Sequence, residues 1–159
     1  MLFDSHTHLN NEGMSDAYLA QLYKEIEASD VSYVCDIGFD LGSSLKAVEH
    51  AKQLPWCYAV VGVHPLDAKT LDEDVLLMIK SLAKKDKVQA IGEIGLDYHY
   101  NLSEPDVQRY WFRRQIQLAN ELKMPIVIHS READQECMDI LKEEGAFSDE
   151  RCSWFPKRK

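Results

Sequence analysis

Two patterns of apolar and polar residues follow one another repeatedly along this chain. Short apolar runs rich in β-branched residues predict strands, and each is followed by a stretch in which apolar residues recur with a helical period. The runs are mostly apolar on both faces, which is typical of a parallel sheet covered by helices. The five expected strands are Leu2 to His8, Val31 to Gly38, Cys57 to Pro65, Val88 to Asp97 and Pro125 to Ser130.

The stretches after these runs repeat apolar residues three, four and seven positions apart, so each predicts a helix with one buried stripe. The stripes comprise Leu19, Leu22, Tyr23 and Ile26; Leu45, Val48 and Ala51; Val75, Met78, Ile79 and Leu82; Val107, Trp111, Leu118 and Leu122; and Ala133, Cys137, Ile140 and Leu141. Ser103 with Asp106 three residues later predicts a capping box for the fourth helix, and Gly145 predicts the end of the fifth.

Successive β/α units with right-handed crossovers form either an open doubly wound sheet or a closed barrel. Polar residues stand near the carboxyl ends of the expected strands, where both architectures place active sites. Side chains from so many strands converge in a barrel and rarely meet in an open sheet. We therefore predict an α/β fold of TIM-barrel type, an incomplete barrel with about five of the eight β/α units. The polar residues are His6, His8, His64, Glu93, Asp97 and His129.

Length and composition are those of one globular domain. The 159 residues, 45% of them apolar, can bury one core, and we expect a partial barrel over residues 1–146 and an irregular tail over 147–159. The formal charge of −9 argues against a broad basic surface for nucleic acid, so we expect metal ions to supply the positive charge that binds phosphate.

Three further features bear on where the protein works. The first residues lack the succession of regions that forms a secretory signal, and no apolar stretch reaches membrane-spanning length. The four cysteines are far apart, without a C-x-x-C pair, as expected of free thiols in a reducing compartment. These features predict a cytoplasmic protein with no membrane partner. The cysteines are Cys35, Cys57, Cys137 and Cys152.

The first expected strand carries an H-x-H motif formed by His6 and His8. Residues i and i+2 of a strand face the same side, so both imidazoles should project together and could hold an ion. The alternative is a strand with two solvated or hydrogen-bonded histidines, and the motif alone leaves both readings open. Asp4 has the same parity and would either support the ligands or form a polar layer inside the barrel.

Glu93 and His129 are polar residues in otherwise apolar strands. Glu93, in "AIGEIGLDY", predicts either a buried salt bridge or a metal ligand whose two oxygens bridge two ions. His129, at the end of "PIVIH", predicts either an ordinary hydrogen bond or a metal ligand. Taken with His6 and His8, they form a nitrogen and oxygen ligand set suited to zinc or manganese.

His64, in "VGVHP", and Arg131, after His129, are candidates for binding an anionic substrate. A guanidinium matches phosphate geometry, and an imidazole N–H can donate to an oxyanion. The alternatives are a turn residue before Pro65 and a solvated start of the fifth helix. Residues Tyr98 to Tyr100 either line the mouth of the site or are ordinary loop residues.

Four motifs, "FDSHTHLN", "GVHP", "IGEIGLDY" and "PIVIHSREA", occur in this order over nearly all of residues 1–145. Their order and spacing closely resemble the TatD-type metal-dependent deoxyribonucleases, a branch of the amidohydrolase-like TIM barrels. The resemblance implies hydrolysis of DNA phosphodiester bonds, often from a 3′ end, with two divalent ions among magnesium, manganese and zinc. The expected substrate is DNA or another phosphoester.

The resemblance also assigns roles to individual residues. It implies that His6 and His8 bind one metal, that Glu93 is shared between two, and that His129 binds the second. His64 and Arg131 match positions associated with substrate or phosphate, so the resemblance makes Glu93, His64 and Arg131 the catalytic candidates. The family continues into a later histidine-bearing strand and an aspartate-bearing strand, which have no counterpart that can be assigned in this chain.

An incomplete barrel leaves unpaired backbone edges on its first and fifth strands. We therefore expect self-association, pairing with a complementing C-terminal fragment, or a loosely packed monomer. Two alternatives to the nuclease remain. The chain could be a non-catalytic fragment that binds one ion through His6 and His8, with or without Glu93. It could instead be a barrel hydrolase that acts on an amide or a lactone.

Overall fold

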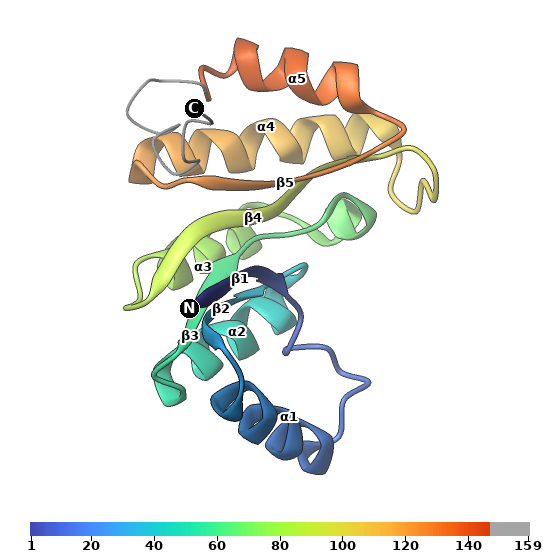
Figure 1. Ribbon diagram of the computed structural model, residues 1–159. Coiled ribbons are helices and arrows are strands. Elements are labelled where there is room, and N and C mark those ends of the chain that lie inside the picture. The colour runs from blue at the N-terminus through green and yellow to red at the C-terminus, as the bar shows by residue number, and fades with distance from the viewer. Residues whose placement is uncertain (147–159) are drawn as a thin grey trace, which may run out of the picture.

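The computed structural model describes residues 1–146, so the tail expected over 147–159 falls outside the described part. Strands and helices alternate along the chain, with one 3-10 helix, η1, between β3 and α3 (Figure 1). The elements are β1 (Leu2–Thr7), α1 (Asp16–Ala28), β2 (Val31–Ile37), α2 (Leu41–Gln53), β3 (Cys57–Val61), η1 (Pro65–Thr70), α3 (Glu73–Ala83), β4 (Val88–Asp97), α4 (Pro105–Leu122), β5 (Ile126–Arg131) and α5 (Asp134–Glu143).

The five strands form one parallel sheet in the order β1-β2-β3-β4-β5, which is also their order in the sequence. The sheet curls into a half-barrel with the helices along one side of it (Figure 1). Sequential parallel strands with covering helices are the arrangement of a (β/α) barrel. The prediction of an incomplete TIM-type barrel is therefore confirmed.

Several boundaries differ from the predictions. β1 ends at Thr7, so His8 lies just beyond the strand, and β3 ends at Val61, so His64 instead caps the start of η1. The capping box predicted for α4 is wrong. The Ser103 hydroxyl donates to the carbonyl oxygen of Leu66 over 2.9 Å, and Glu104 occupies the N-cap without a side-chain bond.

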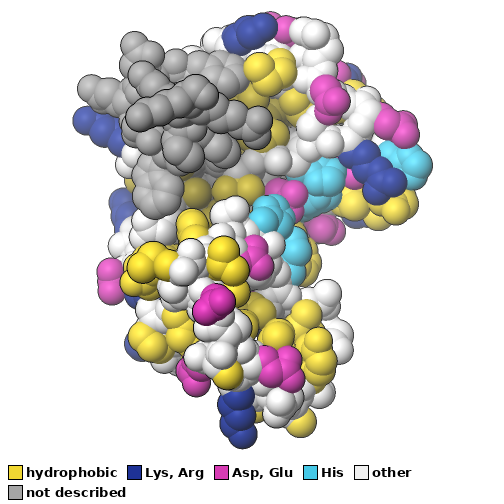
Figure 2. Space-filling view, viewed as in Figure 1, with side chains coloured by type: hydrophobic (Ala, Val, Ile, Leu, Met, Phe, Trp, Pro, Cys, Tyr) yellow, Lys and Arg dark blue, Asp and Glu magenta, His cyan; other side chains and the backbone are white. Residues whose placement is uncertain are grey.

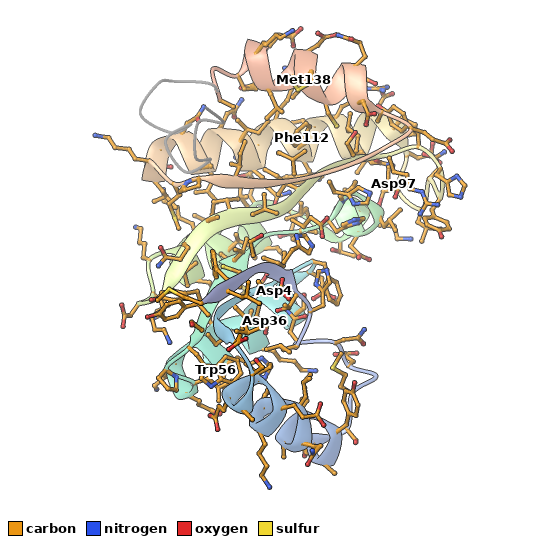
Figure 3. All side chains as sticks on the ribbon, in the orientation of Figure 1. Asp4, Asp36, Trp56, Asp97, Phe112 and Met138 are labelled. Carbon is orange, nitrogen blue, oxygen red and sulfur yellow. The ribbon has the colours of Figure 1, made fainter. Side chains whose placement is uncertain are left out.

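The main core lies between the sheet and α2, α3, α4 and α5. Phe112 of α4, whose position is marked in Figure 3, is 1% exposed and packs in this core with Ile91 and Ile94 of β4. Leu45 and Met78, expected in buried stripes, are 52% and 53% exposed, so that prediction is wrong. The reason for Leu45 is that α2 packs on the sheet through small residues: Ser43, Ser44, Ala47 and Ala51.

The inner face of the half-barrel is partly open. Among the described residues β1 pairs with β2 alone and β5 with β4 alone, so each has one free edge. Phe3 and Tyr33 are 48% and 42% exposed. They line a groove together with Cys35, Tyr58 and Gln89. Over residues 1–146 no helix is both long and apolar enough to cross a membrane.

Candidate metal centre

The carboxyl ends of the strands meet at one rim, on the right in Figure 1, and histidine side chains gather there in a hollow of the surface (Figure 2). Glu93 of β4 lies at the centre of this cluster. Its Oε2 is 3.5 Å from His6 Nε2 and 3.9 Å from His8 Nε2, while its Oε1 is 3.3 Å from His129 Nδ1. The structure thus brings together all four residues predicted as metal ligands.

The cluster divides into two groups that share Glu93. The first is His6, His8 and Glu93, and the second is His64, Glu93 and His129. Within each group one potential ligand atom from each residue lies within 4.8 Å of the others. Imidazole nitrogen and carboxylate oxygen are donors that zinc and manganese accept, so the donor set fits a divalent cation.

The backbone sets the orientation of His8 and Glu93. His8 Nδ1 donates to the carbonyl oxygen of Ile37 over 2.9 Å, which leaves Nε2 free for a ligand on the side of Glu93. β4 continues past the end of β3, and the Glu93 amide donates to the carbonyl oxygen of Gly38 over 2.9 Å. Both candidate ligands are thus tied to the carboxyl end of β2.

Asp97, labelled in Figure 3, is a strand-end residue whose part in the site the motifs did not indicate. It is 1% exposed, and its Oδ2 lies 2.9 Å from Nε2 of His129. A carboxylate on the far nitrogen of a ligating histidine fixes the ring and raises its basicity. Asp97 therefore holds His129 with Nδ1 toward Glu93. The available indication was its place at a strand end, four residues after Glu93.

Opposite charges shape the pKa values around His129. Burial disfavours charge on the ring, but the carboxylates of Glu93 and Asp97 outweigh this and raise the pKa of His129. Burial likewise acts against the carboxylates, yet the hydrogen bond from His129 helps to lower the pKa of Glu93. The Tyr100 amide and His129 together lower the pKa of Asp97.

His64 faces the same hollow in a different protonation state. Its Nδ1 accepts the Leu66 amide over 3.2 Å, so the proton of the neutral ring lies on Nε2. Its ring centroid is 4.1 Å from that of His129. Burial, followed by the nearby His129, lowers the pKa of His64 to about 4. His64 is therefore both a turn residue and a neutral hydrogen-bond donor beside the predicted ligands.

Gly95 allows β4 and β5 to approach closely beside His129. Its φ is +152°, and a Cβ at this position would lie 1.8 Å from the carbonyl oxygen of His129. Gly92 is similar, because its Cβ would lie 2.7 Å from a side-chain carbon of Val127. These glycines in the "IGEIG" segment therefore allow the backbone contact that brings β5 against Glu93.

A curled parallel β/α sheet with histidines and a carboxylate at its strand ends is the arrangement of an amidohydrolase-like barrel with a candidate metal site. The family model described as "TatD related DNase" matches residues 3–151. The chain belongs to this family, as its motifs predicted.

Among its relatives is an uncharacterized metal-dependent hydrolase, YabD of Bacillus subtilis, 44% identical over 92% of this chain and 57% of the relative. The 3'-5' ssDNA/RNA exonuclease TatD of Erwinia tasmaniensis is 34% identical over 87% of this chain and 50% of that protein. The crystal structure of YJJV, a TatD homologue from Escherichia coli, shares the fold with a TM-score of 0.79 at 20% identity. That match covers 89% of this chain and 55% of the other. The chain thus spans about half the length of the curated relatives it matches.

Proposed function

We propose that this chain carries the metal-binding part of a hydrolase that cleaves phosphodiester bonds in DNA. The observation that carries the proposal is the division of the Glu93 carboxylate, with Oε2 facing His6 and His8 and Oε1 facing His129. A carboxylate between two histidine groups suits two divalent ions that share one ligand. The relative named as a single-stranded DNA and RNA exonuclease supports nucleic acid as the substrate.

The metal ligands in this proposal are His6, His8, Glu93 and His129. Three imidazoles with one carboxylate favour zinc or manganese over magnesium, which prefers oxygen ligands. When bound, such ions lower the pKa of a coordinated water and stabilise the charge that develops on the phosphate. Asp97 keeps Nδ1 of His129 directed at the site.

His64 and Arg131 bind the scissile phosphate. Neutral His64 presents Nε2–H, since its Nδ1 already accepts the Leu66 amide. Arg131 forms no ion pair with any residue in 1–146, whereas Arg109, Arg113 and Arg114 are all paired with carboxylates. A guanidinium without a carboxylate partner keeps its N–H donors for a phosphate.

A second candidate is a fragment that binds one ion and has no activity. It is favoured by the engagement of His64 Nδ1, which leaves two residues, Glu93 and His129, as the remaining ligand candidates of the second group. The first group retains three donors, His6, His8 and Glu93. The number of ions bound therefore separates the two candidates.

Calorimetric titration with manganese or zinc measures that number. Two ions per chain are expected. Glu93→Gln should weaken the binding of both ions, because the amide keeps only one of the two oxygens that the carboxylate offers. Glu49→Gln makes the same change on α2, where Glu49 bonds to Gln53, and should leave both affinities unchanged. If the wild type and Glu93→Gln bound the metal ions with equal affinity, Glu93 would not be a metal ligand.

Activity is measured as metal-dependent degradation of single-stranded DNA. We expect the wild type to degrade it with manganese, and Glu93→Gln to be inactive. His64→Ala should lower the rate by about 100–1,000-fold, as expected for one lost donor to a phosphate. Two bound ions without degradation would exclude nuclease activity of this chain by itself, and one bound ion without degradation would support the inactive fragment.

The open inner face is covered by a second polypeptide in this proposal, either another copy or a complementing fragment with the later β/α units. The free edges of β1 and β5 and the exposed Phe3 and Tyr33 support this. Analytical ultracentrifugation should show a species larger than 18.3 kDa at micromolar concentration. A monomer that melts cooperatively would exclude self-association. The cytoplasmic location stays a prediction.

A further inference from the structure

The loop after β4 places an aromatic ring beside the candidate metal centre. Tyr100 is 54% exposed, and the guanidinium carbon of Arg131 lies 4.6 Å from its ring centroid. The His99 ring meets Tyr100 edge-on at 4.8 Å between centroids. Basic and apolar side chains accordingly appear beside the histidine-lined hollow in Figure 2. We call Tyr100 and Arg131 the stacked pair.

Asp97 ties the stacked pair to the metal centre. While its Oδ2 contacts His129, its Oδ1 accepts the backbone amides of His99 over 3.1 Å and of Tyr100 over 2.9 Å. One buried carboxylate therefore fixes both a predicted metal ligand and the loop that carries the exposed ring. This loop is held in a defined position next to the site.

Arg131 provides the second connection. It follows His129 by two residues on β5, which corresponds to about 7 Å along a strand. The Tyr98 amide donates to the carbonyl oxygen of Arg131 over 3.0 Å, so the loop after β4 and the end of β5 are joined by backbone. A guanidinium that stacks by its face keeps the N–H groups on its edge for a phosphate.

We infer that the stacked pair is a platform for a nucleobase of single-stranded nucleic acid, adjoining the phosphate bound by His64 and Arg131. This inference rests on the proposed function for the position of the phosphate. An exposed tyrosine ring with an arginine beside it offers both stacking and cation–π attraction to a base. Such a platform accepts any base, because every base has a π-face.

The test compares two fluorescent oligonucleotides of equal length and charge, eight thymidines and eight abasic residues, in a chelator so that no hydrolysis occurs. Fluorescence anisotropy gives both affinities. We expect the wild type to bind the thymidine oligonucleotide about tenfold or more tightly than the abasic one. Tyr100→Ala should abolish this preference, and Tyr100→Phe should retain it, because stacking needs the ring and not the hydroxyl.

Tyr18→Ala is the matched control, since Tyr18 is 57% exposed but lies on α1. It should bind both oligonucleotides as the wild type does. Equal wild-type affinity for the two oligonucleotides, including no binding of either, would overturn the platform, as would an unchanged preference in Tyr100→Ala. Metal-dependent hydrolysis is assayed separately. If the wild type prefers thymidines but does not hydrolyse DNA, the platform stands and the nuclease is refuted. If it hydrolyses DNA without this preference, the nuclease stands and the platform is refuted.

Discussion

Replacing Gly95 with alanine should displace the strand that carries His129. The new Cβ would lie 1.8 Å from the carbonyl oxygen of His129, whereas real Cβ atoms approach no closer than 3.0 Å. β5 must therefore retreat from β4 by at least about 1.2 Å, a shift that follows from those two distances. This moves His129 away from Glu93 and Asp97.

The cost has two parts. A φ of +152° is strained for an L-residue, which costs about 1–3 kcal/mol. Forcing one extra carbon into a packed contact costs about 1–3 kcal/mol more. Gly95→Ala should thus lower the free energy of unfolding by about 2–6 kcal/mol, a large share of the roughly 5–15 kcal/mol of a typical domain.

The variant Gly145→Ala separates the cost of backbone strain from the cost of the steric contact. Gly145 also has a positive φ, +66°, but its Cβ would meet no atom of residues 1–146 within 4 Å. This control should lose only about 1–2 kcal/mol from the backbone. Urea unfolding followed by tryptophan fluorescence measures both variants, and calorimetry measures their manganese affinity. The reasoning fails if Gly95→Ala is no less stable than Gly145→Ala, or if it binds manganese as tightly as the wild type.

Three other perturbations test buried contacts within the fold. Gln115→Leu should lower the free energy of unfolding in urea by about 2–4 kcal/mol. The reason is that the buried Gln115 amide hydrogen-bonds to both the N–H and the C=O of Val63, at 2.9 and 3.0 Å. A loss below about 1 kcal/mol would contradict this. His50→Ala should cost about 3 kcal/mol, since it removes the partner 2.7 Å from the fully buried Asp36, and wild-type stability would argue against the pair. Burial raises the pKa of Cys57 to about 12, so iodoacetamide should label this thiol at pH 8 only after the protein unfolds. Mass spectrometry of the peptide that contains Cys57 measures the labelling. If the folded protein were labelled as fast as the protein in urea, the thiol would not be buried. The same shift implies that stability falls as the pH rises above 9, where the thiol of the unfolded chain ionises first.

The sequence determined the order of the elements and the identity of the ligand candidates. Apolar runs and helical stripes set the β/α alternation, because each strand buries two faces and each helix one. Polar residues at strand ends identified His6, His8, Glu93 and His129, since parallel strands present their carboxyl ends at one rim. Residue type and position along a strand are local properties, so the sequence alone is enough to predict them.

The tertiary structure decided how those side chains meet. The two oxygens of Glu93 are divided between histidine groups because the curl of the sheet brings β1 opposite β4 and β5, which no local pattern encodes. The bond from Leu66 fixes the proton of His64, and the packing of small residues on α2 turns Leu45 outward. The double role of Asp97 likewise depends on the β4–β5 register, which pairs Asp97 with Arg131 and is set by backbone hydrogen bonds between residues far apart in sequence.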